Sequence, residues 1–307
     1  MNSEISPTAP AASSSTVDES RLRMLWREYA ERRGAVVALI VCVVLLAAAI
    51  LAPIIAPQNP YDLSVIDIFD SRLPPGSVNP AGFTYWLGTD GQGRDMLSAM
   101  IYGLRLSLFV GVLSGLLAIS AGVTVGLIAA YAGGAVDALL MRVVDFMLGF
   151  PAILVALILL AVLGQGVDKV IFALVMVQWA YFARAVRGTA MIERNKEYVE
   201  AAISLGLSRP RIVFGHILPN CMPPIIVIGT MQIAHAISTE ATLSFLGLGL
   251  PITEPSLGLL IANGFSFLLS GLYWISVFPG LLLLVTIFSI NIVGDRLRDV
   301  LNPRLQK

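Results

Sequence analysis

Charged residues are scarce in this chain. Lys, Arg, Asp and Glu make up 13% of its 307 residues, whereas soluble domains average about 25%. Hydrophobic residues reach 57%, and the mean hydropathy is +0.83. This composition excludes a large soluble domain and predicts an integral membrane protein. The formal net charge is zero, so nothing suggests a nucleic-acid partner.

Cysteine is nearly absent, and nucleotide-binding motifs are missing. The two cysteines, Cys42 and Cys221, lie in separate apolar segments without the spacing of metal ligands. We interpret both as apolar filling residues. The sequence also has no Gly-rich phosphate loop of the Walker type, which is the usual ATP-binding signature. We therefore expect no metal, no cofactor and no ATP hydrolysis on this chain itself.

Three segments precede the main membrane region. Residues 1–20 are rich in Ser, Ala, Thr and Pro, and five arginines follow between positions 21 and 33. This composition predicts a disordered, basic segment over residues 1–34. The apolar run 35–57 exceeds the roughly 7–15 apolar residues of a signal peptide, so we predict an uncleaved first membrane span. Residues 58–100 are polar and rich in Pro, Gly and Asp, and we expect them outside the membrane.

Further apolar runs approach or exceed the ~20 residues that a membrane-spanning helix needs. They cover residues 101–131, 144–163, 170–187, 222–243 and 274–294. We thus predict an all-α protein with six transmembrane helices, a membrane domain over 101–295 and a tail at 296–307. Small residues repeat at Gly111/Gly115 and Gly122/Gly126. This spacing favours close helix packing, either within the chain or on a partner.

The segment between the last two runs, 256–270, follows a stretch broken by Gly and Pro. It predicts a short helix at the outer face, with a seventh span over 257–272 as the alternative. Basic residues favour six spans: with the N-terminus inside, sixteen Lys and Arg fall on inner segments and three on outer loops. By the positive-inside rule, both termini and the loop 187–219 are cytoplasmic and 58–100 is periplasmic.

The stretch 197–219 is a long polar interval between two apolar runs. Asn195 can cap a helix start, and Glu197 and Glu200 then lie near the positive end of that helix. Gly206 suits a left-handed helix stop. We predict a helix–turn–helix here; an ordinary polar loop that turns at Gly206 is the alternative.

This stretch also resembles the EAA loop of ABC-importer permease subunits. The matching features are Glu-Ala-Ala, then Gly four residues later, then Leu-Pro twelve residues after the Gly. The family often has Ile where this chain has His216. In that family the loop is a cytoplasmic coupling helix that docks on the ATPase subunit. The resemblance assigns this coupling role to Glu197, Glu200, Ala201, Ala202, Gly206, His216, Leu218 and Pro219.

A second motif occupies residues 87–98. From the residues alone it is a turn-rich segment in which Asp90 and Asp95 bind nearby backbone groups. It is also similar to the signature of the second permease subunit of dipeptide and oligopeptide importers. The matching residues are Gly88, Thr89, Asp90, Gly93, Arg94 and Asp95.

The resemblance recurs at 240–250 and 290–305, and so covers nearly everything after the N-terminal segment. It implies a type-I importer core of about five spans plus one N-terminal span, in a bacterial inner membrane. The implied partners are a homologous second permease, one or two cytoplasmic ATPases and a periplasmic substrate-binding protein. The implied activity is import of di- or oligopeptides, or of related solutes such as nickel chelates, opines or glutathione, by alternating access.

Two other functions are compatible with a multi-span protein. A stand-alone secondary transporter or channel tends to place ionisable groups deep in the membrane. Here Asp145 and Arg187 fall near inner span ends, and Glu240 near an outer end. A membrane anchor without transport activity would need no cytoplasmic docking loop.

Glu240 and Arg105 are the charged residues for which we expect the largest desolvation cost. Glu240 lies 18 residues after Met222, or ~27 Å along a helix, near the outer boundary of a ~30 Å hydrocarbon layer. Arg105 begins the second span at a similar depth. We hypothesise that the two form a structural ion pair. The alternatives are that each reaches the interface or pairs with the second permease.

Overall fold

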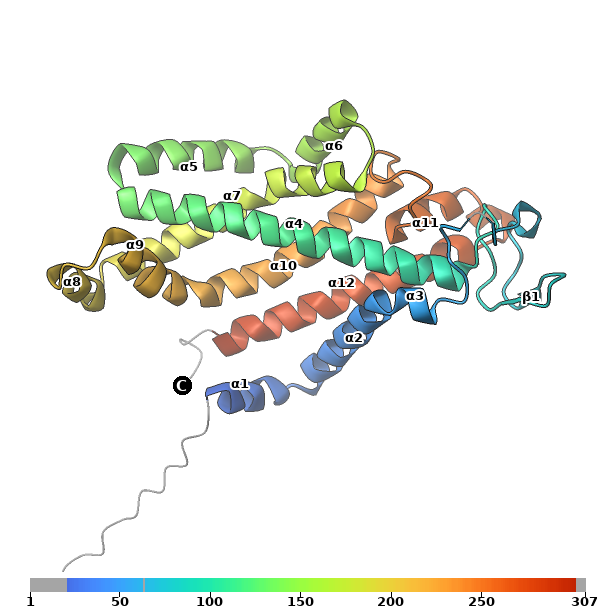
Figure 1. Ribbon diagram of the computed structural model, residues 1–307, viewed down its shortest axis with the longest axis horizontal. Coiled ribbons are helices and arrows are strands. Elements are labelled where there is room, and N and C mark those ends of the chain that lie inside the picture. The colour runs from blue at the N-terminus through green and yellow to red at the C-terminus, as the bar shows by residue number, and fades with distance from the viewer. Residues whose placement is uncertain (1–20, 63, 302–307) are drawn as a thin grey trace, which may run out of the picture.

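The computed structural model describes residues 21–62 and 64–301 and is built almost wholly of helices (Figure 1). The predictions for residues 1–20 and for the end of the tail, 302–307, lie outside the described residues. The helices are α1 (Arg21–Ala30), α2 (Arg33–Ile50), α3 (Ala52–Ile55), α4 (Met96–Ala132), α5 (Gly134–Gly149), α6 (Ala152–Leu163), α7 (Val167–Arg194), α8 (Glu197–Ser204), α9 (Arg209–Ile212), α10 (Leu218–Phe245), α11 (Leu257–Phe265) and α12 (Trp274–Leu301).

Shorter elements complete the chain. A small antiparallel hairpin joins β1 (Ser77–Val78) to β2 (Thr84–Tyr85), with Ser77 opposite Tyr85. Single turns of 3₁₀ helix cover Ile68–Asp70 and Leu268–Ser270, and one π-helical turn covers Val213–Ile217.

Within the described part of the chain, five helices are long and apolar enough to cross a membrane, and α5 with α6 forms a sixth candidate that is bent by 88°. The apolar run 144–163 is therefore divided between α5 and α6, with the break at Phe150 and Pro151. Pro151 occupies the N-cap position of α6, and only Phe150 separates it from the end of α5. A proline ring clashes with the preceding helical turn and donates no N–H, so the chain bends there.

The segment between α10 and α12 contains one short helix, α11, of 9 residues. At 1.5 Å per residue it is about 14 Å long, far short of the ~30 Å hydrocarbon layer. The predicted short helix is confirmed, and the alternative of a seventh span is wrong.

Both glycine pairs of α4 are used inside this chain. A Cβ added to Gly122 would lie 2.4 Å from the Cβ of Phe182 on α7, and one added to Gly111 would lie 2.6 Å from Cγ1 of Ile237 on α10. The absence of side chains at these positions lets α4 pack closely against two neighbours. The glycines therefore allow close helix packing within this chain.

The predicted disorder of residues 1–34 is wrong for α1. Arg296 on α12 donates hydrogen bonds to the carbonyl oxygens of Glu28 and Tyr29 in the last turn of α1. A cation at a helix C-terminus is favourable. Tyr29, Ala35 and Val300 form a small apolar cluster beneath this contact, so α1 is held against the end of α12.

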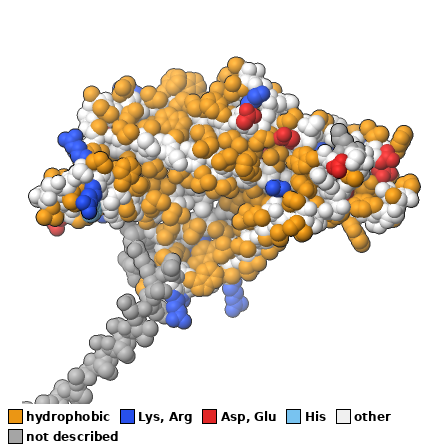
Figure 2. Space-filling view, in the orientation of Figure 1, with side chains coloured by type: hydrophobic (Ala, Val, Ile, Leu, Met, Phe, Trp, Pro, Cys, Tyr) orange, Lys and Arg blue, Asp and Glu red, His pale blue; other side chains and the backbone are white. Residues whose placement is uncertain are grey.

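The long helices run side by side along the molecule, with α8 and α9 at one end and the hairpin and α11 at the other (Figure 1). Hydrophobic side chains cover most of the middle of the visible face, and basic side chains gather at the end formed by α8 and α9 (Figure 2). A wide apolar belt between polar ends is the surface that a membrane-embedded bundle requires.

Candidate functional site

The predicted helix–turn–helix begins with α8, two residues after the end of α7. Glu197 and Glu200 lie in the first turn of α8 as expected, where the helix dipole favours negative charge. The predicted cap is wrong: Lys196 holds the N-cap position without a side-chain bond, and Asn195 instead ends α7.

A left-handed stop ends α8, as the sequence predicts. Gly206 has φ of 72°, its N–H donates to the carbonyl oxygen of Ile203, and the N–H of Leu207 donates to that of Ala202. These two bonds form a Schellman motif, which satisfies carbonyls left free at a helix end. The turn therefore has a fixed geometry.

The second helix is longer than predicted. The α9 helix, the π-helical turn Val213–Ile217 and α10 run on without a break, so that Arg209–Phe245 forms one candidate span. The N–H of Leu218 donates to the carbonyl oxygen of Val213, a π-type bond, immediately before Pro219. Pro219 has no N–H to donate, and a π-helical turn is one way in which a helix absorbs such a defect.

The inner face of the loop packs on the membrane helices. Val199, Ala202, Ile212 and Ile217 are buried in one apolar cluster with Leu127 of α4 and residues of α7. The two alanines of the Glu-Ala-Ala motif therefore lie on different faces of α8: Ala202 faces inward and Ala201 is exposed.

A polar anchor also attaches α8 to the membrane helices. The Tyr198 hydroxyl donates to Oε2 of Glu193 on α7 at 2.7 Å and accepts from Nδ2 of Asn220 on α10 at 3.3 Å. Desolvation and the bond to Glu193 raise the pKa of Tyr198 to about 12, so the hydroxyl remains a donor near neutral pH. No sequence pattern indicates this anchor, because its three residues belong to three different helices.

The outer face of the loop carries acidic and apolar groups together. Glu197, Glu200 and Ala201 are exposed, and Ile203 and Leu205 expose 56% and 80% of their surfaces. Large apolar side chains exposed on a rigid helix next to charges are typical of a protein-contact surface. The remaining loop residues named from the sequence have other positions: His216 and Leu218 are half-buried, and Pro219 is exposed.

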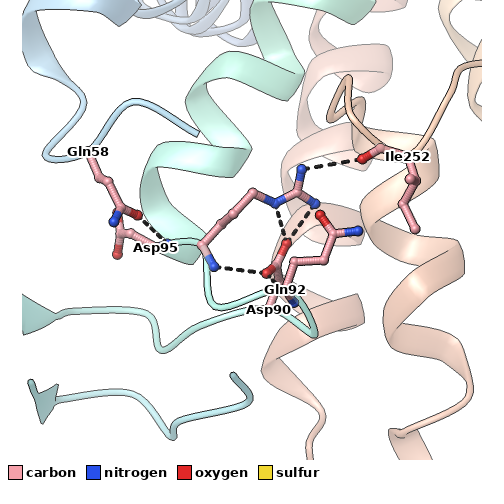
Figure 3. A network of polar contacts seen from close by, with 6 residues as sticks. Gln58, Asp90, Gln92, Asp95 and Ile252 are labelled. Atoms are coloured by element: carbon pink, nitrogen blue, oxygen red, sulfur yellow. Dashed lines mark hydrogen bonds and ion pairs between the residues drawn. The ribbon is translucent and has the colours of Figure 1, made fainter. Parts of the chain in front are cut away.

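The motif at 87–98 lies at the opposite end of the molecule and is buried. Asp90 and Arg94 form an ion pair at 2.7 Å, and their side chains are only 2% and 3% exposed. Oδ1 of Asp90 also accepts from the backbone N–H groups of Gln92 and Arg94, and Nη1 of Arg94 reaches the carbonyl oxygen of Ile252 at 3.5 Å (Figure 3).

Neighbouring residues extend this network. The Thr89 carbonyl oxygen accepts from the indole N–H of Trp274 on α12. Gly88 and Gly93 both have positive φ, and a Cβ on Gly93 would lie 2.1 Å from the carbonyl oxygen of Asp67. Asp95 caps α4 by accepting from the N–H and hydroxyl of Ser98. Burial raises the pKa of Asp95, and the bonds from Ser98 oppose that rise.

These contacts assign the motif a structural role. It joins the start of α4 to the preceding outer segment, to α12 and to the loop before α11. We name residues 87–98 the outer clamp. The interpretation from the residues alone, that Asp90 and Asp95 bind nearby backbone groups, is confirmed.

The predicted ion pair between Arg105 and Glu240 is not formed. Glu240 is fully buried and accepts hydrogen bonds from the hydroxyls of Ser107 and Ser244. Among the described residues no ion pair joins it to Arg105, which is exposed. Residues two apart on a helix point to different sides. Because Ser107 faces Glu240, Arg105 faces away.

The fold and the two polar ends define a multi-pass membrane protein with an ordered loop exposed at one end (Figure 2). Residues 122–307 match the family described as the inner membrane component of binding-protein-dependent transport systems, and residues 20–75 match the N-terminal transmembrane domain of oligopeptide transport permease C. The chain belongs to this family of ABC-importer permease subunits. The resemblance stated from the sequence is confirmed.

Individual relatives agree with this assignment. The chain is 35% identical to the di/tripeptide transport system permease protein DppC of Pseudomonas aeruginosa, over 97% of both chains. It is also 35% identical to the oligopeptide transport system permease protein OppC of Bacillus subtilis, over 98% of this chain and 97% of the other. A solved inward-facing structure of the MetNI methionine ABC transporter shares the fold. It covers 67% of this chain and 98% of its own, with 18% identity and a TM-score of 0.55.

Two further properties follow from membership of this family. The protein is a multi-pass component of a bacterial inner membrane, and a permease of an ABC importer works with an ATPase and a substrate-binding protein. The stand-alone secondary transporter or channel is not favoured.

Proposed function

We propose that this chain is the second permease subunit of an ATP-driven importer for dipeptides, oligopeptides or related small solutes. The names of the full-length relatives support this substrate class. The chain pairs with a homologous permease, and ATP hydrolysis takes place on one or two separate cytoplasmic ATPase subunits. No cofactor is needed on this chain, and both of its termini are cytoplasmic.

Transport follows alternating access, in which ligands and nucleotide shift the balance between inward-open and outward-open states. When ATP closes the ATPase dimer, the loop 197–219 moves with it. The membrane helices then rock and open the path toward the periplasm. The substrate-binding protein delivers the solute to that outward-open state.

The observation that carries the proposal is the two-sided character of α8. Its inner face is held by the apolar cluster around Val199 and by the Tyr198 anchor, while its outer face leaves Glu200, Ile203 and Leu205 exposed. A helix that is rigidly attached on one side and uncovered on the other can pass a displacement from a docked partner to the bundle.

Charge reversal at Glu200 tests the docking role. Glu200→Arg should leave the protein folded in the membrane but weaken its hold on the ATPase, since an unfavourable charge at a docked contact costs roughly 2–5 kcal/mol. The readouts are ATPase copurification and solute uptake. Asp295→Arg is the matched control, because Asp295 is exposed near the end of α12 and lies outside the loop. Normal copurification and uptake with Glu200→Arg would contradict the proposal.

A further inference from the structure

A groove of about 750 Å³ lies between α2 and the outer half of α4. Its walls are apolar, with Leu46 and Ile50 from α2 and Phe109, Val112 and Leu116 from α4. These five side chains are among the large apolar groups that remain exposed in the chain. Figure 1 shows α2 and α3 beside this part of α4. Ala49 of α2 packs against Leu104 of α4 in a buried cluster, so the groove runs beside a direct contact between the two helices.

Arg105 is the one charged residue that lines the groove. It is exposed, and among residues 21–62 and 64–301 it forms no ion pair. Tyr61 and Tyr102 line the same end and meet edge to face, with ring centroids 5.4 Å apart. Burial and the nearby carboxylate of Glu254 raise the pKa of the Tyr61 hydroxyl, and Arg105 is close enough to oppose that rise. One end of the groove therefore offers a guanidinium beside a phenol hydroxyl.

The length of the groove matches one leaflet. From Arg105 to Leu116 is eleven residues of continuous helix, or ~16 Å, which is about half of a ~30 Å hydrocarbon layer. A spanning helix of a partner subunit would need a surface along the whole layer. An acyl chain with its headgroup at the interface needs only one half.

We propose that this groove binds one phospholipid of the outer leaflet, with an acyl chain along Phe109, Val112 and Leu116 and the phosphate at Arg105. Guanidinium groups suit phosphate because their N–H donors match two of its oxygens at once. The bound lipid fills the groove beside the contact of α2 with α4 and covers the apolar surface there. This inference does not depend on which solute the transporter carries.

Photo-cross-linking in the complete transporter tests the proposal in native membranes. With p-benzoylphenylalanine in place of Phe109, illumination should give an adduct that carries the mass of a phospholipid. Arg105→Gln should reduce its yield about tenfold, as expected for the loss of one hydrogen-bonded charge. Lys169→Gln is the matched control and should leave the yield unchanged, because Lys169 lies near the start of α7 and outside the groove.

A second variant gives an independent result if Arg105→Gln fails to assemble. Val112→Trp fills the groove but keeps Arg105, and it should also lower the phospholipid adduct. An adduct with another polypeptide would overturn the proposal, because a partner would then cover the groove. A phospholipid adduct that neither variant reduces would identify ordinary boundary lipid and would also overturn it. So would the absence of any adduct, with the photoreactive residue at exposed Phe146 as the positive control for the chemistry.

Discussion

At the scale of single residues, the outer clamp depends on the ion pair of Asp90 and Arg94. Both side chains are almost completely buried, and a buried charge that loses its partner is expensive. Asp90→Ala should therefore destabilise the protein by about 3–5 kcal/mol. The measurement is the thermal unfolding of the purified transporter.

Two comparisons make this prediction specific. The double variant Asp90→Ala with Arg94→Met should lose less stability than the sum of the single variants, because no unpaired charge is left behind. Arg32→Ala should change stability by no more than about 1 kcal/mol, since the Arg32 side chain in its pair with Asp299 is 70% exposed. Strict additivity of the two clamp variants would contradict the assigned role.

For Arg105 and Glu240, the sequence predicts the depth of each residue in the membrane but not the direction of its side chain. Depth along a helix follows from residue counting, and it placed Arg105 and Glu240 at matching levels. The direction in which each side chain points depends on how the helices rotate against one another, and that is set by packing. Ser107, two residues from Arg105, accordingly takes the position beside Glu240.

At the scale of elements, the geometry of the loop 197–219 depends on the left-handed residue Gly206 between α8 and α9. Gly206→Ala places a Cβ at φ of 72°, which costs roughly 1–2 kcal/mol. The amides of residues 197–208 should then exchange with deuterium about tenfold faster, as about 1.4 kcal/mol of local destabilisation implies.

Gly215→Ala provides the control for this prediction. Gly215 belongs to the π-helical turn, its φ is not positive, and no atom lies within 4 Å of an added Cβ. Alanine is also the better helix former, so exchange in the loop should not accelerate. Equal effects of the two variants would show that the turn at Gly206 does not set the geometry of α8.

Much of the element structure could be predicted from the sequence, because apolar runs mark the parts of helices that lie in lipid. The runs do not mark helix ends. The α4 helix has 37 residues, or about 55 Å, and therefore projects beyond a ~30 Å layer. Arg209, Arg211 and His216 interrupt the apolar run but not the helix that leads into α10. Hydropathy could not reveal that continuity, nor the docking of α1 on Arg296, which depends on contacts between distant segments.

At the scale of the whole molecule, one continuous helix links the two polar ends. The stretch Arg209–Phe245 has 37 residues, or about 55 Å. It begins beside the turn at Gly206 and ends at Phe245, next to Ser244, whose hydroxyl donates to Glu240. Pro223 and Pro224 lie inside α10, and prolines are the usual sites of helix kinks. A displacement of α8 therefore has a direct path toward the outer half of the bundle.

The proposed orientation of the whole molecule can be tested with single cysteines. The excess of basic residues on one set of loops favours a cytoplasmic loop at 197–219 and a periplasmic segment at 58–100. The test places cysteine at Val78, which is 59% exposed in the hairpin, or at the exposed Ser208, in a background without Cys42 and Cys221. A membrane-impermeant thiol reagent should label Val78→Cys in intact cells and Ser208→Cys only after the inner membrane is opened. Because both residues are exposed and lie at opposite ends of the molecule, the difference in their labelling by the reagent reports the orientation of the protein in the membrane. Labelling of Ser208→Cys in intact cells would reverse the topology and would remove α8 from the reach of any cytoplasmic ATPase.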